Sequence, residues 1–209
     1  MELIYIKAFF SYIFRCVFRR FNLEVFPVFI QQKIFAVSFT VFTASILAQN
    51  YLILPVESAI FGFTPETSLL FIPHGVMVVL GVLFGWASVL GVFAAHFVII
   101  LLPESPFIFG NNGVWAAANS LSVPVSIFLL IHLGLKKSAF KNNFLDFKFM
   151  VGVGLISAFL MHALFYLFLK ITNLGIVSNS FFASFIGQVT GLFAISLLAT
   201  AIASKDGSK

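Results

Sequence analysis

Four polar side chains that can hydrogen-bond a small molecule lie inside long apolar stretches of this chain: His74, His96, Asn119 and Gln188. Imidazole and amide groups both donate and accept hydrogen bonds, so together they could bind a polar solute. A polar group in hydrocarbon is costly and is usually buried in a helix bundle or lines a cavity. We therefore expect these four side chains to line a ligand-binding cavity, with Asn50 and Trp115 at similar depth as further ligand-binding residues.

The same residues have a second interpretation, because amides and histidines also hold transmembrane helices together without any ligand. A metal or haem site is a weaker alternative. His74 and His96 have no carboxylate or cysteine near them in sequence, and two ligands underfill most metal sites. The single cysteine, Cys16, excludes a multi-cysteine site. We predict neither a metal nor a cofactor.

Catalytic chemistry has no support in the sequence. The GxSxG, HExxH and P-loop motifs are absent, so we predict that the protein is not an enzyme. Every acidic residue is expected in a loop or at a terminus, whereas a proton relay needs Asp or Glu within the membrane. This distribution argues against an ion-coupled transporter that works alone.

The composition shows why the helices matter. The chain is 61% hydrophobic and 9% charged, with a mean hydropathy of +1.10, whereas an average soluble domain has about 25% charged residues. We expect an all-α, polytopic membrane protein without a soluble catalytic domain. Its expected partners are the lipid bilayer, a small-molecule solute and a coupling or signalling membrane protein, and no nucleic acid.

The apolar run Leu69–Leu102 contains no Asp, Glu, Lys or Arg. It is too long for one span, because a bilayer core needs about 20 helical residues. Gly85-Trp86 is the expected break, which gives a hairpin of Ser68–Phe84 and Trp86–Leu102. Pro73 starts a helix well but keeps the preceding residue out of one, so the Ile72–Gly75 step is expected to expose backbone groups to a ligand.

Three domains are predicted: residues 1–32 as an interfacial amphipathic segment, 33–204 as a six-helix transmembrane domain, and 205–209 as a polar tail. Besides the hairpin, the expected helices are Lys33–Leu54, Gly113–Leu135 (kinked at Pro124), Phe149–Ile171 and Ser178–Ser204. In the first segment, basic and polar residues at near-fourfold spacing form one helical face, which suits the headgroup region. The predicted helix-packing residues are small and four apart: Ala44 with Ala48, and Gly187 with Gly191.

The positive-inside rule predicts a cytoplasmic N-terminus and a cytoplasmic C-terminus in an inner membrane. With six helices, eleven of the twelve Lys and Arg residues fall inside and only Lys170 falls outside. Three acids, Glu57, Glu66 and Glu104, are expected on outer loops. Counting the hairpin as a single span would put the lysine-rich loop and the N-terminal arginines on opposite sides. The charge pattern therefore favours the break at Gly85-Trp86.

Two family resemblances follow from these residues. Pro73-His74-Gly75, Phe84-Gly85-Trp86, the run from Gly91 to Phe97 and Asn119-Ser120-Leu121 together resemble the membrane-associated sensor (MASE) domains over Leu69–Leu133. Those domains are longer, with about eight helices, and are fused to an effector domain, whereas we expect none in this chain. The resemblance implies sensing through a partner chain.

In size, helix number and topology the chain is also similar to the substrate-binding S components of energy-coupling-factor transporters. The first helix of those proteins often carries an AxxxA face that docks on the coupling subunit, and Ala44–Ala48 has that form. This resemblance implies an outward-facing cavity for a small solute. We expect solute capture for transport, with sensing or a structural role without ligand as the alternatives.

Overall fold

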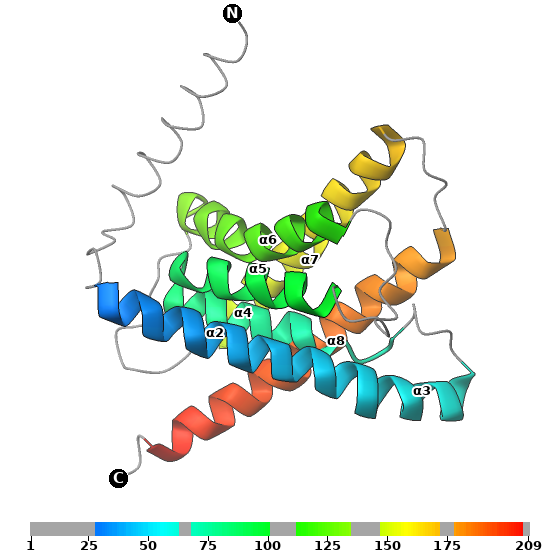
Figure 1. Ribbon diagram of the computed structural model, residues 1–209, viewed down its shortest axis with the longest axis horizontal. Helices are drawn as coiled ribbons and strands as arrows, with labels where there is room; N and C mark the ends of the chain where they lie inside the picture. Colours follow the sequence, from blue (N-terminus) through cyan, green and yellow to red (C-terminus); the bar gives the residue numbers. More distant parts are fainter. Residues whose placement is uncertain (1–27, 63–67, 101–111, 135–146, 172–177, 207–209) are drawn as a thin grey trace, which may run out of the picture. The chain divides into compact units, whose positions relative to one another are not determined.

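The computed structural model describes residues 28–62, 68–100, 112–134, 147–171 and 178–206, and these form helices and short connections. The elements, shown in Figure 1, are α2 (Val28–Ala48), η1 (Gln49–Ile53), α3 (Leu54–Phe61), α4 (Ile72–Phe84), α5 (Ala87–Ile100), α6 (Asn112–His132), α7 (Phe147–Ile171) and α8 (Ser178–Asp206). Because α2, η1 and α3 are continuous, the described residues form six helical rods. The predicted all-α class is confirmed.

The chain divides into two units, Met1–Lys33 and Ile34–Lys209. Of the first unit only Val28–Lys33, the beginning of α2, is described, and there the Lys33 ammonium lies 4.2 Å from the Phe29 ring centroid. The predicted start of the first helix at Lys33 was therefore five residues late. The rest of the predicted interfacial segment lies outside the described residues.

Three helices are long and apolar enough to cross a membrane: Phe29–Phe61, Phe147–Leu167 and Ala183–Ile202. The other described helices, Ile72–Phe84, Ala87–Ile99 and Ala116–His132, are apolar but shorter. At 1.5 Å per residue, α4 extends about 20 Å, less than the roughly 30 Å of a bilayer core. The long helices support membrane association of the chain.

The first helix extends beyond its predicted end at Leu54, because Pro55 stands in the first turn of α3 instead of stopping the helix. Proline lacks an N–H and its ring clashes with the carbonyl four residues earlier. The chain accommodates this with the π-helical turn η1 directly before α3. As a result, Glu57 lies inside a helix and is buried, so its predicted place on an outer loop was wrong.

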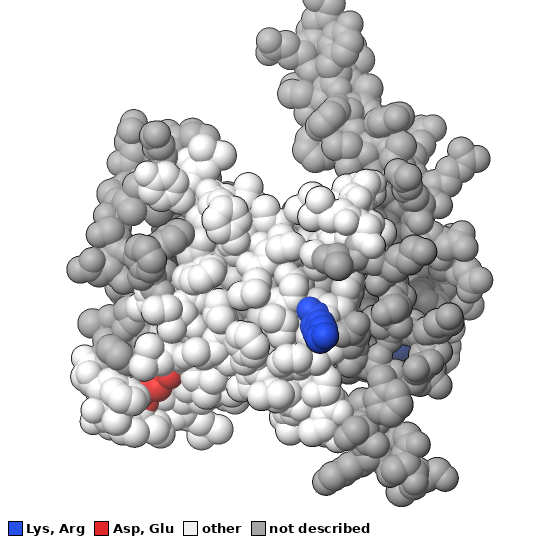
Figure 2. Space-filling view, turned by 180° about the vertical axis from the view of Figure 1, so that it is seen from behind, with Lys and Arg blue, Asp and Glu red and all other residues white. Residues whose placement is uncertain are grey.

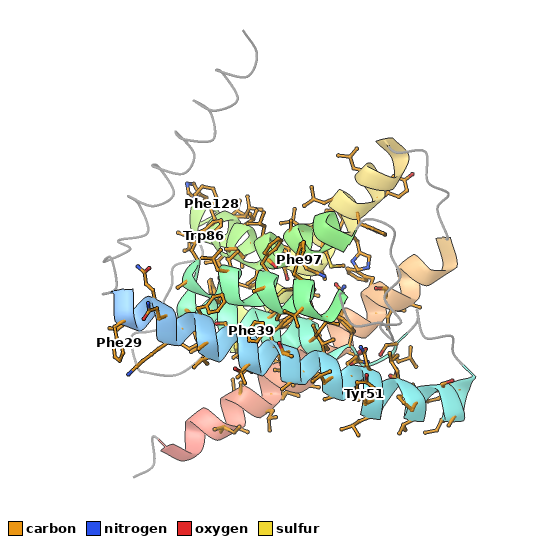
Figure 3. The ribbon with its side chains drawn as sticks, in the orientation of Figure 1. Phe29, Phe39, Tyr51, Trp86, Phe97 and Phe128 are labelled. Atoms are coloured by element: carbon orange, nitrogen blue, oxygen red, sulfur yellow. The ribbon has the colours of Figure 1, made fainter. Side chains whose placement is uncertain are left out.

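The hairpin break is confirmed at Gly85-Trp86, between the end of α4 and the start of α5. Gly85 has φ of 58° and ψ of −134°, a conformation that residues with a Cβ rarely adopt. Figure 3 shows Trp86 at this turn, at the same end as Phe128 and at the opposite end from Tyr51.

Within the second unit, α4 packs against α5, α6, α7 and α8. Its Val78 is fully buried, as are several hydroxyl-bearing residues of neighbouring helices, including Ser126 and Ser157. Large apolar side chains such as Leu90 and Phe159 lie outside, 68% and 65% exposed. Figure 2 shows one face on which the described residues include few charged side chains. Polar groups inside and apolar groups outside suit a hydrocarbon surrounding.

Candidate functional site

His96 on α5 and Asn119 on α6 form the first polar contact between helices. The Nδ1 atom of His96 lies 3.0 Å from the carbonyl oxygen of Val92, which can only accept, so Nδ1 carries the proton. In the neutral ring Nε2 is then an acceptor, and the Asn119 Nδ2 donates to it at 3.3 Å. The ring of Phe42 on α2 packs against the imidazole with centroids 4.7 Å apart. Both nitrogens of His96 therefore have partners within the protein.

His74, in the first turns of α4, contacts α7. Its Nε2 lies 3.1 Å from the carbonyl oxygen of Gly154 and 3.3 Å from Ser157 Oγ, which itself donates to the same carbonyl. The carbonyl accepts the Nε2 proton, which leaves Nδ1 as the acceptor of the neutral ring. This Nδ1 atom is buried and has no hydrogen-bond partner.

Gln188, near the middle of α8, contacts the same helix one turn further along. Its Nε2 donates to Met161 Sδ at 3.3 Å, while its Oε1 is buried without a partner. Because Ser157 and Met161 are four residues apart, they lie above one another on one face of α7. His74 and Gln188 therefore approach that face at successive turns, each with an unpaired acceptor. The two side chains are both 1% exposed.

An unpaired buried acceptor costs about 1–3 kcal/mol, which a ligand or water that donates a hydrogen bond would recover. The two side chains that carry these acceptors contact neighbouring turns of α7, and a small molecule with two N–H or O–H donors could satisfy both. We name this group of four residues the α7 acceptor site: His74, Ser157, Met161 and Gln188. No hydrogen bond between described residues joins it to the His96–Asn119 pair, so the four predicted residues form two separate groups.

A second buried network joins the end of the first helix to the segment before α4. The Glu57 carboxylate accepts hydrogen bonds from Ser68 Oγ at 2.7 Å and from the backbone N–H of Leu70 at 2.9 Å. Gln49 is fully buried; its Nε2 donates to Ser68 Oγ at 2.9 Å and its Oε1 accepts from the N–H of Ile72 at 3.1 Å. We call these the helix-break contacts.

The same segment, Ser68–Phe71, lies against α8. The N–H of Phe71 donates to the carbonyl of Gly187 at 2.8 Å, and Thr190 Oγ1 donates to the carbonyl of Leu69. A Cβ on Gly187 would collide with the backbone of Ser68, and one on Gly191 with the backbone of Phe71. The two glycines therefore allow the non-helical Ser68–Phe71 segment to pack directly against α8.

These contacts correct the prediction for the start of α4. The Ile72–Gly75 step was expected to offer backbone groups to a ligand, but the N–H of Ile72 bonds to Gln49 and that of His74 bonds to the Phe71 carbonyl at 3.3 Å. Non-helical backbone that packs inside a protein needs hydrogen-bond partners, and here side chains of α3 and η1 supply them to Leu70 and Ile72.

The remaining predicted residues are distributed differently. Asn50 lies in η1, half-buried, with Oδ1 buried and unpaired. Trp115 belongs to α6, but its side chain lies outside the described part. Ala44 is exposed and Ala48 is half-buried on α2.

Gln49 is not among the predicted ligand-binding residues, and Glu57 was predicted to lie in a loop. One signal could have predicted that Glu57 lies in a helix. Proline is favoured in the first turn of a helix, and the mostly apolar sequence LPVESAIF can form a helix that contains a single acidic residue.

Metal binding has no structural support among the described residues, because no three of their His, Cys, Asp or Glu side chains come together. Comparison with known proteins gives no relatives to argue from: no family model, curated protein or solved structure matches this chain.

Proposed function

We propose that the chain is a six-span inner-membrane protein, with both termini cytoplasmic, that binds a small solute inside its helix bundle. The spans are Val28–Phe61 and the five helices α4 to α8. The shorter α4 forms its span together with the non-helical Ser68–Phe71 segment that precedes it. Side chains pair the backbone N–H groups of this segment, and two glycines let it approach α8 closely. A discontinuous transmembrane helix requires such partners for its non-helical backbone.

The observation that carries solute binding is the pair of unpaired acceptors in the α7 acceptor site. A bundle held together only by polar contacts would pair these groups with one another, as His96 and Asn119 are paired. Instead, His74 Nδ1 and Gln188 Oε1 are buried and lack donors. The expected solute is small and presents two hydrogen-bond donors, such as an amide or an amine. Its partly apolar surroundings include Met161 and Leu192, both fully buried.

Delivery of the solute to a coupling subunit is the favoured use of this site over reporting to a signalling partner. The observation that favours it is the exposure of Ala44 on α2, which leaves its small-residue face open to a partner helix. The resemblance to S components of energy-coupling-factor transporters implies the same use of this face.

The proposal is tested by a ligand screen on the purified full-length protein in detergent. Native mass spectrometry should detect a co-purifying small molecule, and thermal shifts with vitamins, nucleobases and amino acids should identify stabilising compounds. His74→Leu should abolish the stabilisation by the active compound. The matched control is His132→Leu, because His132 is an exposed histidine at the end of α6 and should leave the shift unchanged. If no compound stabilises the parent and none co-purifies, the solute-binding proposal fails.

A further inference from the structure

Glu57 is a buried carboxylate in an otherwise apolar helix. Its side chain is 7% exposed, and it lies within the 33-residue helix Phe29–Phe61, which is apolar enough to cross a membrane. Both groups that contact its carboxylate are hydrogen-bond donors, Ser68 Oγ and the Leu70 N–H. A charge in such surroundings is costly unless it is paired and hydrogen-bonded. Among the described residues no cation contacts the carboxylate, so these two hydrogen bonds are what offset the cost of burying its charge.

The two donors respond differently to a proton on the carboxylate. An ionised carboxylate accepts at both oxygens, and hydrogen bonds to a charged acceptor are roughly twice as strong as neutral ones. A proton on Glu57 turns one oxygen into a donor. The Ser68 hydroxyl can rotate and accept, but the backbone N–H of Leu70 can only donate. Protonation therefore weakens the attachment of the Ser68–Phe71 segment to α3, because the Leu70 N–H then donates to a neutral oxygen, with Ser68 Oγ at 3.3 Å as its second acceptor.

We propose that Glu57 is a proton-binding site whose ionised form holds the Ser68–Phe71 segment strongly to α3 and whose protonated form holds it more weakly, while the bonds of the segment to η1 and α8 remain. A hydronium ion transfers its proton to a carboxylate oxygen: one O–H bond of hydronium breaks, one O–H bond forms on Glu57, and water is left. The segment leads directly into α4, whose third residue is His74. A weaker hold on the segment therefore acts at the start of the helix that carries this histidine. The site thus connects the external pH to the start of the discontinuous helix, whether or not a solute binds.

The other described side chains around Glu57 do not explain a pH-dependent hold on the Ser68–Phe71 segment. On η1, Gln49 faces the network and does not titrate, whereas Tyr51 is 60% exposed. From α8 the residues that meet the segment are Gly187, Gly191 and Thr190. His74 on α4 is bonded to Gly154 on α7. Within the described chain, Glu57 is the titratable side chain that contacts the segment.

The test is hydrogen–deuterium exchange of the full-length protein in liposomes, measured by mass spectrometry from pH 8 to pH 3 and corrected for the intrinsic exchange rate. Protection of the Leu70 amide should fall on acidification by about fivefold or more, the factor that corresponds to replacing a charged acceptor by a neutral one. Protection that is independent of pH in the parent overturns the proposal. This part of the test needs no variant.

Two variants assign the effect to Glu57. E57Q keeps the shape but cannot ionise, so its Leu70 amide should be weakly protected at every pH, and a parent-like pH response in E57Q contradicts the proposal. S68A removes one donor but keeps the carboxylate and the Leu70 contact, so its protection should still depend on pH. Infrared spectroscopy gives a separate readout: a protonated-carboxyl band should appear on acidification of the parent and be absent from E57Q. If that band persists in E57Q, another acid takes the proton and the assignment is wrong.

Discussion

Asn119 on α6 donates a hydrogen bond across the helix interface to His96 on α5, with 3.3 Å between Nδ2 and Nε2. The Nε2 atom of His96 is the acceptor of this bond. The other ring nitrogen, Nδ1, is bonded to the Val92 carbonyl of the same helix. Polar contacts of this kind between transmembrane helices contribute on average about 0.6 kcal/mol. The contact favours a role in helix association for this pair, rather than in ligand binding.

This role predicts energetic coupling between the two side chains. Asn119→Leu and His96→Leu should each lower the free energy of unfolding, by about 1 kcal/mol, because each leaves a polar partner unpaired. The double variant should lose less than the sum, with a coupling of about 0.5–1.5 kcal/mol. Unfolding in mixed micelles measures the free energy of unfolding of the parent, the two single variants and the double variant. Additive losses, or losses that appear only when a solute is present, would instead place the pair in a ligand site.

Replacing Gln188 should have the opposite effect on the stability of the solute-free protein. The Oε1 atom of Gln188 is a buried acceptor without a donor, so Gln188→Leu removes an unsatisfied group and keeps the volume. Replacing such a group by an apolar one is neutral or stabilising. We expect the thermal midpoint of the solute-free variant to stay the same or rise, and its shift with an active compound to disappear. A clear loss of solute-free stability would show that the amide is satisfied within the protein.

The order of the spans predicts which loops face outward. In a Cys16→Ser background, a cysteine at Glu66 or Glu104 should react with an impermeant maleimide added outside intact cells. A cysteine at Lys141 should react only after the membrane is permeabilised. The physical reason is the Lys and Arg excess on the loops assigned to the cytoplasm. Labelling of position 141 from outside would exclude the six-span arrangement.

The N-terminal segment gives a fourth prediction. Arg15→Glu with Arg19→Glu should weaken binding of a peptide covering residues 1–32 to vesicles that contain anionic lipid. The expected loss is about 1 kcal/mol for each basic charge removed, because basic residues near a membrane surface contribute that much. Sedimentation of lipid vesicles measures it. Uncharged vesicles are the control, since removing the charges should change binding to them little.

Most of the helices could be predicted from the sequence because hydrophobic length and glycine positions are local signals. Gly85 marked the hairpin turn, and the helix from Phe147 to Ile171 was predicted within two residues at its start. The helix through Pro55 was predicted too short, because a proline in the first turn of a helix and one after its end look alike in sequence.

The candidate site could be predicted only in part, because partner choice depends on three-dimensional packing. Apolar surroundings singled out His74 and Gln188 as costly polar residues. Their common neighbour, α7, could not be read from spacing, and neither could the pairing of His96 with Asn119. Ser157 carried no signal at all, since a serine in an apolar helix usually bonds to its own backbone.

The passage of Ser68–Phe71 over α8 gives the last prediction. Gly187→Ala and Gly191→Ala each add a Cβ that meets the backbone of this segment, which cannot move aside as a flexible side chain can. Overpacking of this kind costs about 1–3 kcal/mol, although alanine favours a helix over glycine by about 1 kcal/mol.

Gly152→Ala is the matched control for this test. Its Cβ would lie 3.5 Å from Leu130 Cδ1, an ordinary contact, so only the gain in helix propensity remains. Thermal unfolding in detergent should therefore show lower midpoints for the two α8 variants and an equal or higher midpoint for Gly152→Ala. Because Gly187 also accepts the Phe71 N–H, its variant should additionally lose amide protection at Phe71. Three variants of equal stability would mean that the segment does not lie on α8.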